Sequence, residues 1–234
     1  MESHTEPHSN KSVAKINALR AAVLGANDGI VSVASIIVGV AGANSSKAVI
    51  LTSGIAGLAA GALSMAAGEY ISVSSQKDTQ KALIEKERQE LIDFPEEELK
   101  ELKGLYEKKG LSSKTAMIVA KELTAKDAFA AHLDIELGID PDDLTNPTHA
   151  AIASALSFFI GAIIPLLAVA FSPEKLRIIF TFISAILALT LTGVISAKVG
   201  GANKTKATLR VVIGGILAMA ITYSIGKIVG VTVG

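Results

Sequence analysis

Five long apolar stretches constrain this chain more than any other feature of its sequence. Four of them contain no Asp, Glu, Lys or Arg, and the other is interrupted only by Asp28. They cover residues 21–43, 48–68, 144–173, 178–197 and 211–226. About 20 apolar residues in a helix are enough to cross the hydrocarbon core of a bilayer. The sequence therefore predicts an all-α membrane protein with five transmembrane helices.

A charged block, residues 76–147, separates the second apolar stretch from the third. It holds 17 of the 22 acidic residues and 11 of the 22 basic ones, which gives it a net charge of −6. The whole chain has a net charge of zero, which argues against a nucleic-acid partner. The lipid membrane is the partner that the composition indicates.

These features divide the chain into four expected parts. They are an N-terminal tail (1–19), transmembrane helices 1 and 2 (20–75), an acidic helical domain (76–147) and transmembrane helices 3 to 5 (148–234). The expected membrane spans are roughly 20–43, 48–72, 149–171, 177–198 and 208–231.

Breaks inside the acidic block predict several helices. Asp93-Phe94-Pro95 separates a helix over 76–91 from a second one over 96–109, and Gly110 ends the second. Two short helices are expected after Ser112 or Ser113 and after Thr124, where Thr124-Ala125-Lys126-Asp127 resembles a capping box. Gly138 is expected to end the last helix.

Basic residues near the membrane predict an orientation by the positive-inside rule. On one side lie Lys11, Lys15, Arg20, Lys198, Lys204, Lys206 and Arg210. The opposite side has only Lys47, Lys175 and Arg177. We therefore expect a cytoplasmic N-terminus, a cytoplasmic acidic domain and an external C-terminus.

Asp28 is the most informative single residue, because a charge near the middle of a membrane helix costs about 2.5–3.5 kcal/mol. A functional role is the favoured interpretation. The alternatives are a protonated side chain or a packing carboxylate capped by Asn27 or Ser32. Met65 offers a thioether that suits a soft transition metal, although a lone Met is more often a packing residue.

Paired acidic residues in the block are candidate metal ligands. Glu87 and Glu90 are three residues apart, Glu98 and Glu101 repeat that spacing, and His132 and Glu136 are four apart. Each pair shares one face of a helix. Two such faces together would form a carboxylate-rich site for divalent cations. The alternative is that these pairs lie on ordinary solvated helix faces.

Enzyme chemistry has little support in the sequence. There is no Cys, and no paired catalytic carboxylates, His-rich motif or Ser–His constellation occurs in the membrane spans. We therefore do not expect an enzyme.

Two membrane motifs resemble a known family. They are Gly25-Ala26-Asn27-Asp28-Gly29-Ile30-Val31 and Gly61-Ala62-Leu63-Ser64-Met65-Ala66-Ala67-Gly68-Glu69-Tyr70. Together with the Glu-rich block and Ile135-Glu136-Leu137-Gly138, they resemble the vacuolar iron transporter (VIT) family from about Lys15 to the end of the chain. The second motif is more similar to the bacterial branch.

The resemblance implies a five-helix homodimer that exports Fe²⁺, and often Mn²⁺, from the cytosol in exchange for protons. It implies a transport site at Asp28 and Met65 and no prosthetic group. It also implies that cytoplasmic glutamates collect the metal, and by the family pattern these are Glu87, Glu90, Glu98, Glu101 and Glu136. A bacterial-type member would lie in the plasma membrane, whereas a eukaryotic one would lie in a vacuolar membrane.

The chain departs from the family pattern at two places. Some members have methionines before the last glutamate, where this chain has His132-Leu133, so His132 is a further candidate ligand. Eukaryotic members have a second membrane carboxylate where Gly57 stands here. We therefore expect a transporter of Fe²⁺ and Mn²⁺. The alternative is a membrane-anchored metal-storage or metal-sensing protein.

Overall fold

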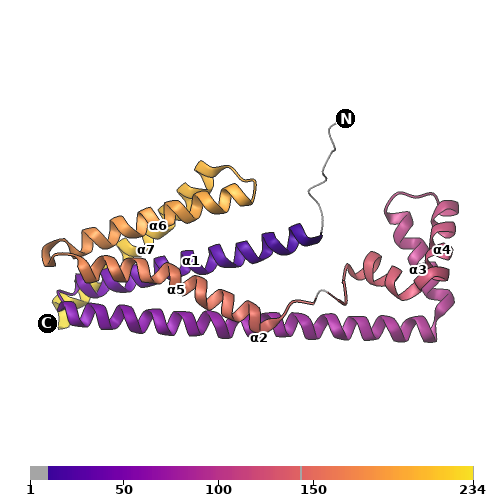
Figure 1. The fold of residues 1–234 in the computed structure, drawn as a ribbon, viewed down its shortest axis with the longest axis horizontal. Helices are drawn as coiled ribbons and strands as arrows, with labels where there is room; N and C mark the ends of the chain where they lie inside the picture. Colours follow the sequence, from indigo (N-terminus) through magenta and orange to yellow (C-terminus); the bar gives the residue numbers. More distant parts are fainter. Residues whose placement is uncertain (1–9, 143, 234) are drawn as a thin grey trace. The chain divides into compact units, whose positions relative to one another are not determined.

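The computed structural model describes residues 10–142 and 144–233, and the regular structure in those ranges is entirely helical (Figure 1). In chain order the elements are α1 (Asn10–Gly42), α2 (Lys47–Asp93), α3 (Pro95–Lys108), α4 (Ser113–His132), the π-helical turn η1 (Leu133–Leu137), α5 (Pro147–Phe171), the 3-10 turn η2 (Glu174–Leu176), α6 (Arg177–Val199) and α7 (Lys204–Val233).

Five helical segments among the described residues are long and apolar enough to cross a membrane. They are Ala21–Gly42, Lys47–Asp93, Pro147–Phe171, Glu174–Lys198 and Lys204–Thr232. This confirms the predicted fold class, an all-α membrane protein with five spans.

The described chain forms two compact units. The first unit contains the residues up to Tyr70 and from Thr148 onward, and the second unit contains Ile71–Pro147. Helix α2 contributes to both units. The expected separation between a membrane span over 48–72 and a helix over 76–91 is wrong, since α2 is one helix from Lys47 to Asp93. No Gly or Pro interrupts the sequence between Tyr70 and Asp93, so nothing ends the helix there.

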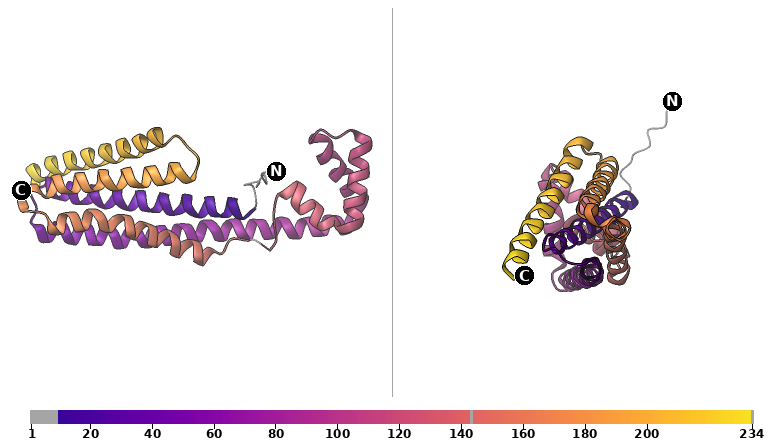
Figure 2. Two further views of the ribbon diagram at one scale, coloured as in Figure 1. Left: turned by 45° about the horizontal axis from the view of Figure 1, so that its top comes forward. Right: turned by 90° about the vertical axis from the view of Figure 1, so that its left-hand side faces the viewer.

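In the first unit, α1 lies between two hydrophobic cores. On one side, Ile30 and Val38 of α1 pack with Leu189 of α6 and Met219 of α7. The other core joins α1 to α2 and α5, and its buried residues are Val33, Ile37, Ile50, Phe158, Ala162, Leu166 and Val169. The left view in Figure 2 shows α1 running lengthwise between its neighbours in this bundle.

Small residues allow α1 and α5 to approach closely. A Cβ added at Gly29 would collide with the carbonyl oxygen of Phe158, and one at Gly161 would collide with the carbonyl oxygen of Ala26. The Phe158 ring is buried and lies directly against Gly61 of α2. Gly25 and Gly29 of the first membrane motif and Gly61 of the second thus face α5 or its Phe158 side chain within a single chain, whereas a Cβ at Gly68 would meet no atom within 4 Å.

The second unit is a small helical domain. Pro95 begins α3, as predicted, because its missing N–H is not needed in the first turn. Leu102 of α3 and Ala116 and Ala120 of α4 are fully buried. Gly110 and Gly138 adopt positive φ angles of 98° and 59° at the ends of α3 and η1.

The expected capping box at Thr124 is wrong. Helix α4 runs through Thr124 and is kinked at Asp127, which has φ −166° and ψ 93°. The Asp127 carboxylate accepts a hydrogen bond from the Ala130 N–H at 2.9 Å. Asp127 is therefore itself the cap of the following helical turn.

Candidate metal centre

Four side chains converge in the second unit. They are Glu87 of α2, Glu98 of α3, His132 at the end of α4, and Glu136 of η1, and we call them the Glu–His cluster. One potential ligand atom from each lies within 4.8 Å of the other three. Ligands on opposite sides of one divalent cation are about 4–5 Å apart, so the spacing fits a single ion.

Local sequence features bring these residues together. The break at Phe94 and Pro95 ends α2 and leaves Glu98 in the first turn of α3. Helix α2 contacts α4 through Arg88, whose guanidinium carbon lies 4.3 Å from the centre of the Phe129 ring. The π-helical turn after His132 keeps Glu136 on the same side as the imidazole.

His132 Nδ1 is the centre of the cluster. It lies 2.9 Å from Glu87 Oε1, 3.3 Å from Glu136 Oε2 and 3.6 Å from Glu98 Oε2. The side chains of His132 and Glu87 are 1% and 4% exposed, whereas that of Glu136 is 26% exposed. His132 and Glu87 are thus buried, whereas Glu136 is the ligand of the cluster that reaches solvent.

Burial raises the pKa of the Glu87 carboxyl above its ordinary value, and the nearby Glu136 charge raises it further. Burial also raises the pKa of Glu98, with a second contribution from Glu101. In both cases His132 lowers the pKa, but not enough to reverse the shift. These carboxylates are crowded, desolvated and short of positive charge.

Two buried atoms of the cluster have no hydrogen-bond partner among the described residues. They are His132 Nε2 and Glu87 Oε1, although Glu87 Oε1 lies only 2.9 Å from His132 Nδ1, close enough for an ion pair when the ring is protonated. Three carboxylates around one imidazole nitrogen are short of positive charge, which a bound cation would supply. Three carboxylates and one imidazole nitrogen form a donor set that divalent first-row transition metals accept.

Glu90 and Glu101, the other two predicted ligands in this unit, lie outside the group of four. The Glu90 carboxylate accepts a hydrogen bond from Lys86 at 2.7 Å, and this bond raises the pKa of Lys86. Glu101 is exposed at the surface of α3. The spacing of the two Glu pairs could not show that Glu87 and Glu98 would be buried in the cluster while Glu90 and Glu101 would lie outside it.

The predicted membrane residues lie in the first unit. Asp28 is exposed on α1 and accepts a hydrogen bond from Ser32 Oγ at 3.2 Å. Met65 of α2 is half-buried and packs against the core that contains Phe158. Asn27, the other expected cap of Asp28, instead accepts a hydrogen bond from Thr192 of α6.

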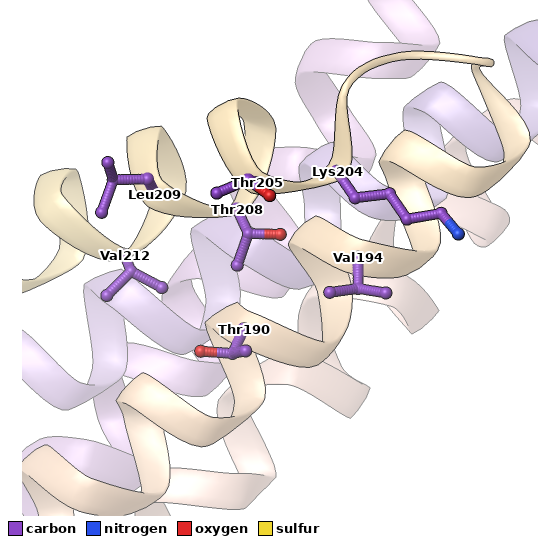
Figure 3. A pocket seen from close by; sticks show the side chains of 7 residues that line it. All are labelled: Thr190, Val194, Lys204, Thr205, Thr208, Leu209 and Val212. Atoms are coloured by element: carbon purple, nitrogen blue, oxygen red, sulfur yellow. The ribbon is translucent and has the colours of Figure 1, made fainter.

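The sequence patterns did not single out a groove between α6 and α7 (Figure 3). It has a volume of about 370 Å³ and is lined by Thr190, Val194, Lys204, Thr205, Thr208, Leu209 and Val212. Apart from Lys204, these residues are of the types found at the end of any membrane helix, so nothing in the sequence indicated a groove.

Comparisons with known proteins agree with the pattern of motifs. Residues 19–227 match the model of the VIT family. A vacuolar iron transporter of Acanthamoeba castellanii is 47% identical over 210 residues, which cover 89% of this chain and 77% of that protein. Vacuolar iron transporter homolog 1 of Oryza sativa is 41% identical over 93% of this chain and 76% of its own length. Homolog 4 of Arabidopsis thaliana is 40% identical over 91% of this chain and 84% of its own length.

Proposed function

This chain belongs to the VIT family, whose members are transporters and not enzymes, and we propose that it exports Fe²⁺ and Mn²⁺ from the cytosol by proton antiport. The observation that carries the proposal is the Glu–His cluster, in which three nearly buried side chains and Glu136 direct ligand atoms at one point. The names of the relatives, which are iron transporters or their homologs, support iron as the cargo.

The donor atoms favour a transition metal over Ca²⁺ or Mg²⁺. Carboxylate oxygens alone suit all four ions, but the imidazole nitrogen of His132 suits Fe²⁺ and Mn²⁺ better than the alkaline-earth ions. Glu87, Glu98, Glu136 and His132 would hold the ion. Glu90 and Glu101 would attract cations to the entrance of the site.

Asp28 and Met65 are the proposed membrane site. The Asp28 carboxylate lies on the outer face of α1 in the single chain, where the hydrocarbon of a bilayer would make its charge costly. A second copy of the chain would cover this face and place two Asp28 residues in one pathway. We therefore propose a homodimer in which Asp28 and Met65 receive the ion.

Protons and metal ions compete for the same oxygens. Each carboxylate must lose its proton before it binds a cation. Protons that reach these carboxylates from the far side of the membrane would therefore displace the metal ion. This competition is the proposed basis of antiport. It does not require a second membrane carboxylate at the position of Gly57.

The positive-inside rule supports an orientation with the N-terminus, the second unit and the α6/α7 loop in the cytosol. The Glu–His cluster would then face the compartment from which iron is removed. We propose the plasma membrane as the location in a bacterium and the vacuolar membrane in a eukaryote.

Flux into proteoliposomes tests the proposal. Purified full-length protein is assayed with Fe²⁺, Mn²⁺ and Ca²⁺, with and without a pH gradient, and compared with Asp28→Asn. We expect gradient-dependent flux of Fe²⁺ and Mn²⁺ that Asp28→Asn abolishes. Tight metal binding without flux of any ion would instead favour the alternative, a membrane-anchored storage or sensing protein, for which one anchoring helix would suffice.

A further inference from the structure

The groove between α6 and α7 has apolar walls that open to the surroundings of the bundle. Val194 of α6 is 37% exposed and Leu209 of α7 is 56% exposed, and Val212 lies deeper. Both helices are long and apolar enough to be membrane spans, and the groove lies at the ends of these spans that the α6/α7 loop joins. An acyl chain is the partner that apolar walls at this depth accept.

One end of the groove is polar. Figure 3 shows Lys204 at the end near the α6/α7 loop and Thr208 one turn farther along α7. Thr208 Oγ1 is buried and has no hydrogen-bond partner among the described residues, whereas Thr190 Oγ1 donates to the carbonyl oxygen of Ile186. The Thr208 hydroxyl lies against Gly193 of α6 and does not open into the groove, so Lys204 is the polar group that a ligand can reach at this end.

The charge around this end is positive and has no nearby acidic residue in the sequence. Lys198, Lys204, Lys206 and Arg210 surround the loop, and the chain contains no Asp or Glu after Glu174. Basic residues next to a membrane span attract anionic headgroups. The orientation expected from the positive-inside rule would place this end in the cytoplasmic leaflet, which is rich in anionic lipids.

We propose that the α6/α7 groove binds one anionic glycerophospholipid. Its phosphate contacts the Lys204 ammonium, and one acyl chain lies between Val194 and Val212. The apolar walls contact the acyl chain, and Lys204 pairs with the negative charge of the headgroup. A neutral lipid lacks that charge, and free phosphate lacks the acyl chain, so neither fits the whole groove. The site is separate from the proposed metal ligands.

Native mass spectrometry of the delipidated full-length protein tests this site. The first binding constants of phosphatidylglycerol and phosphatidylcholine, both dioleoyl, are measured for the wild type, Lys204→Gln and Lys206→Gln. Lys206 is exposed in the same turn but does not line the groove, so it is the matched control. One basic residue near a headgroup changes lipid affinity about fivefold.

We expect the wild type to bind phosphatidylglycerol at least about fivefold more tightly than phosphatidylcholine. Lys204→Gln removes this preference, and Lys206→Gln keeps it. Val194→Phe, which fills the groove, weakens binding of both lipids while thermal unfolding confirms that the protein is folded. Equal binding of the two lipids by the wild type, or an equal loss in both Lys variants, would overturn the proposal. If glycerol phosphate competed as effectively as the lipid, this would also overturn the proposal, since the acyl chain would then contribute nothing to binding.

Discussion

His132 Nδ1 lies 2.9 Å from Glu87 Oε1, although the two residues come from different helices and both are buried. An imidazole lone pair and a carboxylate oxygen repel each other unless a proton or a cation lies between them. Glu98 and Glu136 approach the same nitrogen, so three acidic groups compete for one positive charge. A divalent cation relieves this crowding better than one proton on the ring.

Replacement of His132 by Asn should weaken Mn²⁺ binding by at least about tenfold, because it removes the only nitrogen ligand of the cluster. The preference for Mn²⁺ over Ca²⁺ should fall as well, since the remaining donors are oxygens. Isothermal titration of the full-length protein with each ion measures both effects. Glu122→Gln, at an exposed position of α4, is the control and should bind as the wild type does. Unchanged Mn²⁺ affinity in His132→Asn would exclude the imidazole as a ligand.

Metal binding should weaken as the pH falls, starting above the pH at which an ordinary Glu titrates. The pKa values of Glu87 and Glu98 are raised mainly by burial, so these carboxyls keep their protons to a higher pH than in the unfolded chain. Their contribution to the stability of the metal-free protein is therefore complete below the ordinary pKa and is lost as the pH rises through the raised pKa values. Mn²⁺ should reverse this loss. Titrations and thermal unfolding across about pH 5–8, with and without Mn²⁺, check both signs. A binding constant independent of pH over this range would show that neither carboxyl must lose a proton.

Gly29→Ala should destabilise the first unit, because the new Cβ would collide with the Phe158 carbonyl oxygen in the backbone of α5. Overpacking of this kind costs about 1–3 kcal/mol, and the backbone cannot move aside as a flexible side chain would. Gly214→Ala on α7 is the matched control, since a Cβ there meets no atom within 4 Å. Thermal unfolding in detergent should show a lower midpoint for Gly29→Ala only. Equal midpoints in the two variants would contradict the close packing of α1 on α5.

Local signals in the sequence predicted most of the helix boundaries. Pro95 and Gly110 act through their own backbone chemistry, so their effects are visible without knowledge of the rest of the fold. The kink at Asp127 was missed because Thr124 and Asp127 are both good caps, and tertiary packing decides between them.

Side-chain burial within the candidate site was harder to predict. The Glu pairs showed which residues share a helix face, but Glu98 is buried and Glu101 is exposed on the same helix. That difference depends on where α2 and α4 lie against α3, which is a long-range property. The groove at Lys204 was missed for the same reason, because its two walls come from different helices.

The most direct test of the account is the initial rate of Fe²⁺ flux at limiting and saturating iron in proteoliposomes with Glu98→Gln or its neighbour Glu97→Gln. Glu98 is buried in the Glu–His cluster, whereas Glu97 is exposed and lies outside it. We predict that Glu98→Gln lowers the rate at limiting Fe²⁺ about tenfold, with a smaller loss at saturation, and that Glu97→Gln transports as the wild type does. Equal rates for Glu98→Gln and the wild type at limiting Fe²⁺ would contradict the claim that the cluster delivers the transported ion.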